Sequence, residues 1–382
     1  MKVVIAPDSY KESLTALEVA KLIQAGFQEI FPDAIYTLIP VADGGEGTVT
    51  SLIDATKGQY ITKSVVGPLG QQVEATYGIT GDGKSAIIEM AEASGLALVP
   101  QNQRNPYVTT SFGTGELILD ALNHQVQHII LGIGGSATND GGAGMMQALG
   151  VRFLDQNNRE LPFGGKALSH LETIDVSNLD PRIHACQFDI ACDVDNPLTG
   201  SKGASAIFGP QKGATPEMVM VLDHALAHYA NKIESLMGLE VDHIKGAGAA
   251  GGMGAAGLAF LKGSLRPGIE IVIETTQLEE VIKDADLVIT GEGRIDQQTC
   301  FGKTPMGVAQ VAKKYQKPVI AIAGSLGKGA EQTHQYGIDA VFSITDCPMS
   351  LEEAYQQTPH NLQKMARNIA ATYQMGIMHF NR

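Results

Sequence analysis

The chain has 382 residues, of which 44% are hydrophobic and 18% are charged, and its formal net charge is −14. This acidic balance argues against nucleic acid as a partner, because a phosphate backbone is met by a basic surface. The longest apolar runs fall short of the roughly 18 residues that a membrane-spanning helix needs, so we expect no membrane partner.

The chain is longer than one hydrophobic core usually holds, which favours two domains. Its N-terminus, MKVVIAPDSYKES, lacks the apolar core of a signal peptide. The four cysteines are scattered without a CxxC pair or metal-ligand spacing, as in proteins with reduced thiols: Cys186, Cys192, Cys300 and Cys347. We therefore expect a cytoplasmic protein.

Short apolar runs that end in Gly, Asp or Ser predict buried parallel strands. They lie at 2–7, 36–41, 128–134, 286–293, 317–324 and 340–345. Helical patterns at 15–31, 115–125 and near 306–315 separate several of them. This alternation predicts an α/β fold with right-handed crossovers.

Other segments follow different patterns. Residues 59–90 predict a three-strand meander with Gly and Pro turns. A clear helix follows Thr215, the expected N-cap, with Pro216 at its first position. The simplest partition is a Rossmann-like parallel-sheet domain formed by both chain ends (1–62 and 280–382), with a second α/β domain inserted at 63–279; the pattern of 105–150 fits either domain.

The first polar cluster follows the first predicted strand, where Asp8, Ser9 and Lys11 precede a helix that Ser13 or Thr15 would cap. Ligands bind at the carboxyl ends of strands in open α/β sheets, so Lys11 is placed to meet a phosphate or carboxylate. The alternative is that Asp8 and Ser9 only form turn hydrogen bonds and Lys11 is a surface lysine.

In PVADGGEGTVTSLI (40–53), Asp43 and Glu46 flank Gly44 and Gly45 before a helix. Glycines let the backbone approach a ligand and helix N–H groups favour an anion, whereas the carboxylates suit Mg²⁺, a base or hydroxyl recognition. Acidic residues that only complement the helix dipole are the alternative.

The stretch GIGGSATNDGGAGM (132–145) places Gly134, Gly135 and Ser136 between a strand and a helix. It fits neither the P-loop nor the dinucleotide fingerprint. We favour a phosphate or carboxylate cradle of another design over a flexible loop or tight packing. For the small-residue run 246–261, close helix packing is favoured slightly over a second anion loop.

Two further stretches carry charged residues. Strand alternation at 188–200 delivers Asp189, Asp193 and Asp195, which suit Mg²⁺ binding or deprotonation of a hydroxyl, or only form turns before a proline. The glycine-rich segment that follows carries Lys202 and Lys212, which face either phosphates or solvent. At 289–305, Arg294 stands between Glu292 and Asp296 and either clamps an anion bidentately or forms an internal ion pair.

Glycine loops with acids and cations at strand ends supply the parts that phosphoryl transfer needs, namely positioning and charge neutralisation. From the residues alone, the chain is a kinase or another phosphate-handling α/β enzyme. Eight motifs, in family order from residue 3 to about 324, resemble the bacterial glycerate kinase family of the two-domain type: VVIAPDSYKESLTA, PVADGGEGT, SFGTGEL, GIGGSATNDGG, ACDVDNPL, FGPQKGATPEM, AAGGMG and ITGEGRID.

The resemblance implies ATP- and Mg²⁺-dependent phosphorylation of D-glycerate, most often at the 2-hydroxyl, giving 2-phospho-D-glycerate and ADP. It also implies a role in glyoxylate or glucarate metabolism, with the active site in the cleft between the two domains. Phosphorylation at the 3-hydroxyl, a small hydroxy-acid dehydrogenase and a non-catalytic sugar-acid sensor stay open, and so does the oligomeric state, with a homodimer as one option.

We assign roles to the motif residues as hypotheses. Asp193 is the first choice for the catalytic base and Asp189 its rival, while Asp43 or Asp195 would hold Mg²⁺. The groups that would bind substrate or phosphate are Asp8, Ser9, Lys11, Gly44, Gly45, Glu46, Gly134, Gly135, Ser136, Glu292, Arg294 and Asp296; among them, Ser9, Lys11 and Arg294 would meet the glycerate carboxylate or the transferred phosphoryl group.

Overall fold

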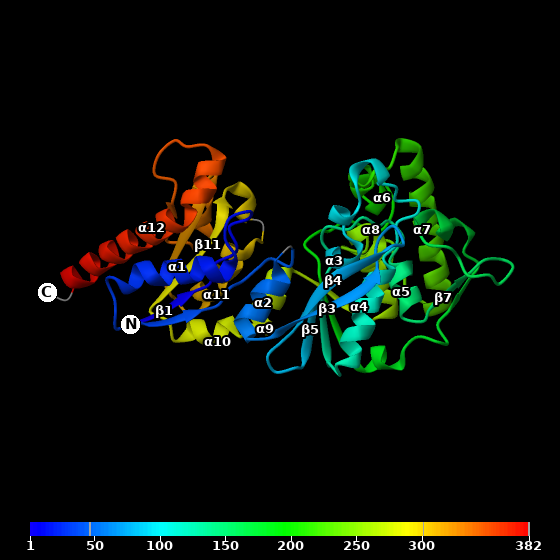
Figure 1. Cartoon of the computed structure of the whole chain (residues 1–382), viewed down its shortest axis with the longest axis horizontal. Coiled ribbons are helices and arrows are strands. Elements are labelled where there is room, and N and C mark those ends of the chain that lie inside the picture. Colours follow the sequence, from blue (N-terminus) through cyan, green and yellow to red (C-terminus); the bar gives the residue numbers. More distant parts are fainter. Residues whose placement is uncertain (46, 301, 381–382) are drawn as a thin grey trace. The chain divides into compact units, whose positions relative to one another are not determined.

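The structure, a computed structural model, describes residues 1–45, 47–300 and 302–380. The chain forms two compact units (Figure 1). Unit 1 comprises Met1–Asp43, Thr50–Thr56 and Ile269–Arg382, and unit 2 comprises Gly44–Val49 and Lys57–Gly268. The predicted α/β class is confirmed, because both chain ends build one parallel sheet and a second, mixed sheet is inserted between them.

The sheet of unit 1 has five parallel strands in the order β13-β12-β11-β1-β2. Strand β1 pairs with β11 from the far end of the chain, with Val3 opposite Leu287. The bounds are β1 (Lys2–Ile5), β2 (Ile35–Leu38), β11 (Leu287–Ile295), β12 (Val319–Leu326) and β13 (Ala340–Ser343). All five coincide with predicted apolar runs.

Helices α1 (Ala16–Gln28) and α12 (Leu351–Phe380) pack together on this sheet (Figure 1). Gly26 of α1 allows the close approach, since a Cβ there would collide with the backbone of α12. The cap of α1 is Thr15, whose hydroxyl accepts from the Glu18 N–H while the Glu18 carboxylate accepts from the Thr15 N–H. The other helices of this region are α2 (Thr48–Thr56), α9 (Gly268–Thr275), α10 (Leu278–Lys283) and α11 (Thr304–Lys314).

The sheet of unit 2 has the order β10-β9-β6-β5-β4-β3. Its bounds are β3 (Gln59–Val66), β4 (Gln72–Ile79), β5 (Ser85–Glu89), β6 (His128–Gly132), β9 (Gln187–Ala191) and β10 (Ser264–Arg266). Strands β3, β4 and β5 form the predicted antiparallel meander, and β5, β6, β9 and β10 are parallel. A small antiparallel pair, β7 (Arg152–Leu154) and β8 (Thr173–Asp175), stands apart from this sheet.

The helices of unit 2 are α3 (Ala91–Ser94), α4 (Phe112–Asn123), α5 (Ala143–Ala148), α6 (Ala204–Phe208), α7 (Pro216–Met237) and α8 (Ala249–Phe260). The expected start of α7 is confirmed, because the Thr215 hydroxyl accepts from the Met218 N–H at 3.3 Å and proline occupies the first turn.

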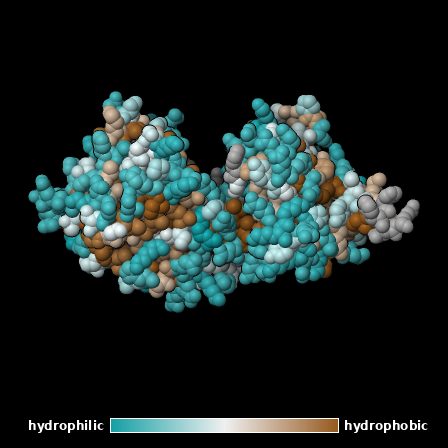
Figure 2. Space-filling model, turned by 180° about the vertical axis from the view of Figure 1, so that it is seen from behind, coloured by the Kyte–Doolittle hydropathy of each residue, from teal (hydrophilic) through white to brown (hydrophobic). Residues whose placement is uncertain are grey.

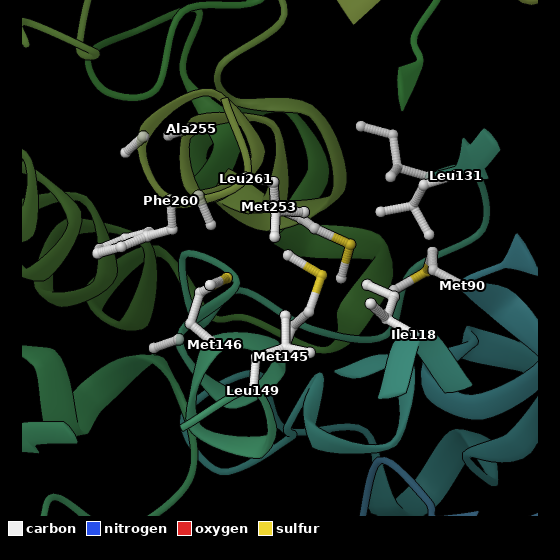
Figure 3. Close-up of a cluster of buried hydrophobic side chains, with 14 of the residues drawn as sticks. Met90, Ile118, Leu131, Met145, Met146, Leu149, Met253, Ala255, Phe260 and Leu261 are labelled. Carbon is white, nitrogen blue, oxygen red and sulfur yellow. The ribbon is translucent and has the colours of Figure 1, made fainter. Parts of the chain in front are cut away.

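The core of unit 2 is rich in methionine, with Met90, Met145, Met146 and Met253 gathered among aliphatic side chains and Phe260 (Figure 3). Unbranched thioether side chains fill the irregular spaces between small helices. Helix α8 is built almost wholly from glycine and alanine and is buried, and a Cβ at Gly257 would collide with Ile190. Close packing is therefore the structural role of the run 246–261.

The unit boundaries differ from the predicted domain limits at both ends. Residues 44–49 and 57–62, predicted for the first domain, belong to unit 2; β3 starts at Gln59 and pairs with β4 along its full length. Residues 269–279 belong to unit 1, and residues 105–150 lie in unit 2. Neither limit carries a linker-like composition that sequence patterns could detect.

Hydrophilic residues cover most of the face in Figure 2, with apolar residues gathered in places on unit 2, at the left. No helix within the described ranges is long and apolar enough to cross a membrane.

Candidate functional site

A cavity of about 460 Å³ opens in unit 1 at the carboxyl ends of its parallel strands. The loop after β1, the end of β11 and the end of β12 form one wall, and the first turns of α12 form the other. Predicted site residues line it at one end: Asp8, Ser9, Lys11, Asp43, Glu292 and Arg294. The rule that ligands meet the carboxyl edge of a parallel sheet thus brings together side chains from three separate motifs.

Asp8, on the cavity wall, accepts hydrogen bonds from Thr304 and Ser9. The Thr304 hydroxyl donates to its Oδ2 at 2.7 Å, and the Ser9 N–H donates to its Oδ1 at 2.6 Å. Burial nevertheless raises the pKa of Asp8 to about 6, and the nearby Asp43 carboxylate acts in the same direction. Asp8 therefore carries a negative charge that its own surroundings stabilise poorly.

Glu292 on β11 is the second buried acid, with only 8% of its surface exposed. The Thr299 hydroxyl donates to its Oε1 at 2.5 Å, and Lys303 Nζ lies 3.6 Å from its Oε2. Burial raises the pKa of Glu292 to about 7, with further contributions from Asp8 and Asp43. Two acids with raised pKa values beside a third carboxylate favour a bound cation or a shared proton.

The carboxylates fit a magnesium ion only in part. Mg²⁺ is usually bound by one or two carboxylates together with substrate phosphates, and Asp8 and Asp43 supply such oxygens. Over the described ranges, no group of three or more His, Cys, Asp or Glu side chains is arranged to hold a metal. A magnesium site here would need oxygen ligands from the substrate.

Three cations stand near these acids. Lys11 and Lys303 line the cavity, and Arg294 lies at its mouth with 67% of its side chain exposed. Arg294 Nε is 3.2 Å from Asp296 Oδ2, so the internal ion pair considered above is present. Asp296 does not line the cavity; it also accepts from the Gln298 N–H at 2.9 Å and so orients Arg294 and shapes the loop.

The far end of the cavity is largely apolar and was missed by the sequence analysis. It is lined by Ile344, Met349, Leu351, Ala354 and Tyr355, with the buried polar residues Thr358 and Asn361 from α12. An amphipathic pattern over α12 was the available signal, but it could not show that this face meets a strand edge.

The predicted anion loop lies in unit 2, between β6 and α5. Gly134 and Gly135 are exposed, and Gly135 has φ 73°, a conformation that favours glycine. Ser136 is buried, and its hydroxyl accepts from Lys212 Nζ at 2.6 Å. The two glycines thus present bare backbone to a ligand, whereas the serine hydroxyl is already bonded from within.

The structure contradicts both predictions made for Lys212, because its side chain faces neither solvent nor an open phosphate site. It is 2% exposed, and its Nζ also donates to the Thr138 carbonyl at 2.6 Å. Burial lowers the pKa of Lys212 to about 7, although Asp140 nearby acts in the opposite direction. The lysine fixes the loop from inside.

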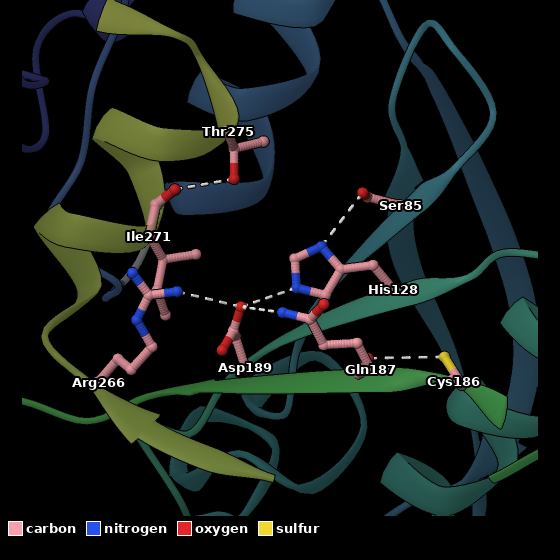
Figure 4. Close-up of polar contacts among 8 residues, drawn as sticks. All are labelled: Ser85, His128, Cys186, Gln187, Asp189, Arg266, Ile271 and Thr275. Atoms are coloured by element: carbon pink, nitrogen blue, oxygen red, sulfur yellow. Dashed lines mark hydrogen bonds and ion pairs between the residues drawn. The ribbon is translucent and has the colours of Figure 1, made fainter. Parts of the chain in front are cut away.

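Asp189 lies in the middle of β9, not in a loop, and three side chains surround its Oδ2 (Figure 4). His128 Nε2 is 2.9 Å away, Gln187 Nε2 donates at 3.2 Å, and an Arg266 guanidinium nitrogen donates at 3.3 Å. All three contacts are made to Oδ2, and they hold this buried carboxylate in place within the sheet.

The other acids of this stretch are exposed. Asp193 follows β9, and its Oδ1 accepts from the Gly268 N–H at 3.1 Å. Asp195 pairs with Lys245 at 2.9 Å, with both side chains largely in solvent. An exposed carboxylate that is paired with a surface lysine is a weak candidate for a metal ligand.

The remaining predicted residues lie in the loop before α2. Gly44 has φ 90° and is buried, and a Cβ there would press against Gly268 and Ala191, so packing explains its glycine. The Gly45 carbonyl accepts from the Thr48 hydroxyl at 2.7 Å. Glu46 lies outside the described residues.

Known proteins are similar to this chain over nearly its whole length. Residues 3–374 match the model of the glycerate kinase family. The chain is 59% identical to the glycerate 2-kinase of Escherichia coli (strain K12) over 99% of both sequences, and 58% identical to the glycerate kinase of Halalkalibacterium halodurans over 96% of this chain and 97% of that one. A crystal structure from Salmonella typhimurium LT2, 57% identical, matches 99% of both chains with a TM-score of 0.93.

Proposed function

The chain belongs to the glycerate kinase family, and we therefore propose that it transfers the γ-phosphoryl group of ATP to the 2-hydroxyl of D-glycerate, giving 2-phospho-D-glycerate and ADP. The observation that carries the proposal is the polar end of the unit 1 cavity, where Asp8, Asp43 and Glu292 face Lys11 and Lys303. Phosphoryl transfer needs positioned charges of both signs.

In the proposed reaction, the 2-hydroxyl oxygen forms a bond to the γ-phosphorus, and the bond from that phosphorus to the bridging oxygen of ADP breaks. Lys11, Lys303 and Arg294 would neutralise the phosphate oxygens as charge moves toward ADP. Magnesium bound with the nucleotide would screen the same charge, and Asp8 and Asp43 are the residues that would hold it.

The hydroxyl proton would pass to a carboxylate. We retain Asp193 as the base, because it is exposed just after β9, whereas Asp189 is buried within the strand and held by three side chains. The backbone N–H groups of Gly134 and Gly135 would bind an anionic group of the substrates. Each assignment is based on the position and hydrogen bonds of its residue, and substitution of that residue tests it.

The test is phosphorus NMR of the products formed from D-glycerate, MgATP and the purified protein. We expect 2-phosphoglycerate and ADP in equal amounts. A 3-phosphoglycerate signal would keep the kinase and overturn the position of transfer. If ATP is not consumed with D-glycerate but is consumed with another hydroxy acid, the proposed substrate is wrong.

The proposed partners are D-glycerate and ATP, in the cytoplasm, with no macromolecular partner required for turnover. A homodimer remains a proposal that sedimentation equilibrium would test. The dehydrogenase alternative is disfavoured by the family and by the missing dinucleotide fingerprint, and a fluorescence titration with NADH would reveal it.

A further inference from the structure

The segments that line the unit 1 cavity differ in chemistry. Charged residues gather at the strand ends, as described above, while Ile344, Met349, Leu351 and Ala354 line the end toward α12. A three-carbon acid that carries a carboxylate and two hydroxyls has no apolar surface to bury there. A cavity of about 460 Å³ also has the size of pockets for much larger ligands.

Asn361 supplies a polar group at this apolar end. It lines the cavity from α12 with 6% of its surface exposed; no described residue is hydrogen-bonded to its side-chain amide, whose atoms remain accessible to solvent. Thr358, one turn earlier and equally buried, instead donates to the Ala354 carbonyl at 2.7 Å. An amide that lines a cavity and has no partner within the protein is available to hydrogen-bond a ligand there.

The chemistry of an amide fits one part of a nucleotide. Its oxygen accepts and its nitrogen donates side by side, which complements the amino group and the adjacent ring nitrogen of adenine. Tyr355 and Met349 add the polarisable surface against which a flat heterocycle packs. The cations Lys11 and Lys303 line the same cavity from other segments of the chain, where phosphates would be neutralised.

We infer that the unit 1 cavity is the nucleotide site of this protein, with the adenine ring against α12 and its edge hydrogen-bonded to Asn361. The inference rests on the proposed function, because it places the ATP of that reaction. It reserves the polar end for the phosphates and leaves the acceptor acid to be bound elsewhere.

The test compares Asn361→Leu, which keeps the volume and removes the amide, with Asn368→Leu, a matched control on the exposed face of the same helix. Calorimetry measures binding of a non-hydrolysable MgATP analogue, and kinetics give KM for MgATP, MgITP and D-glycerate. ITP carries a carbonyl where ATP carries the amino group, so ITP lacks the donor that would bond to the oxygen of the Asn361 amide.

We expect Asn361→Leu to weaken ATP binding about 10- to 100-fold, the effect of losing one bidentate base contact. KM for D-glycerate should stay near the wild-type value. The wild type should prefer ATP to ITP, and the variant should lose that preference. Asn368→Leu should behave as the wild type in every assay.

A shift in KM for D-glycerate with unchanged ATP binding would overturn the inference and leave the kinase intact. Unchanged ATP binding and an unchanged preference over ITP would also overturn it. Because calorimetry needs no turnover, a wild type that binds the analogue but phosphorylates no glycerate would refute the proposed reaction and still test the site. If Asn361→Leu fails to fold, Ala354→Phe fills the apolar end instead, and undiminished ATP binding by that variant would refute the site.

Discussion

The two units bury ionisable side chains in opposite ways. In unit 1, Asp8 and Glu292 lie on the wall of a cavity, and Asp43 beside them has the same charge. In unit 2, Lys212 is enclosed, with its ammonium bonded to Ser136 and Thr138 and the carboxylate of Asp140 nearby. Both arrangements shift pKa values toward neutrality.

The difference lies in what completes each arrangement. The acids of unit 1 repel one another beside an open cavity, so a ligand would relieve an existing electrostatic cost. The lysine of unit 2 already donates to groups of its own protein. A shifted pKa alone therefore does not mark a ligand site; shifted pKa values in like-charged groups that line a cavity do.

The largest effect that we expect is a loss of turnover, and it should distinguish Asp193 from Asp189 in unit 2. Asp193→Asn should lower kcat by about 10²- to 10⁴-fold, as loss of a general base does. Asp189→Asn should mainly lower the melting temperature, because it weakens contacts to His128 and Arg266. Steady-state kinetics and thermal melts of both variants decide, and near-normal turnover by Asp193→Asn would eliminate that assignment.

Removing an acid from the cavity should harm activity but not folding. We expect Asp8→Asn to lower kcat/KM by about 10²- to 10³-fold, since it removes one of the two carboxylates proposed to hold the magnesium of the nucleotide. The melting temperature should stay equal or rise, because like-charge repulsion is reduced. A lower melting temperature with normal turnover would place Asp8 with the structural charges instead.

Removing the lysine should do the reverse. Lys212→Met leaves the buried Thr138 carbonyl without its donor, so the free energy of unfolding should fall by about 1–3 kcal/mol. The exposed Lys202→Met is the matched control and should leave stability unchanged. Urea titration measures both, and equal stability of the two variants would contradict the positioning role.

The smallest expected effect is a difference in the sign of pH dependence. The pKa values of Asp8 and Glu292 rise from 3.8 and 4.5 to about 6 and about 7, so the folded state binds more protons in that range. Their stabilising contribution is complete below the unfolded values and is lost as pH rises through the folded ones.

Lys212 acts at higher pH and in the other direction. Folding lowers the pKa of Lys212 from 10.5 to about 7. Between these two pH values the unfolded state binds more protons than the folded state, so the free energy of unfolding increases as the pH rises from about 7 to 10.5. Urea titrations from pH 4 to 10 should show the low-pH slope weakened in Asp8→Asn and the high-pH slope weakened in Lys212→Met. Slopes that are unchanged in both variants would show that other groups dominate.

Local patterns predicted the fold and much of the polar cavity end. Caps such as Thr15 and Thr215 depend on neighbours three residues away, and apolar runs identify strands without knowledge of their partners. Asp8 and Glu292 were found because parallel strands place their carboxyl ends at one edge of a sheet.

The rest depends on contacts between distant residues. Lys212 is buried by partners 76 and 74 residues away, and Asp189 by partners 61 and 77 residues away. The sequence pattern predicted a lysine that faces phosphates or solvent, and an acid that is a rival for the catalytic base or only forms a turn. The apolar cavity end was missed because α12 meets the strand edge only in the folded unit.

The pairing of β1 with β11 has a consequence for synthesis. The Thr290 hydroxyl donates to the Ala6 carbonyl across 284 residues of chain, so the first strand leaves the ribosome long before its neighbour exists. The continuous stretch Lys57–Gly268 is complete earlier and can fold while translation proceeds. Until the last third of the chain emerges, the edge of β1 that pairs with β11 stays unpaired, and nascent-chain chaperones would need to shield it.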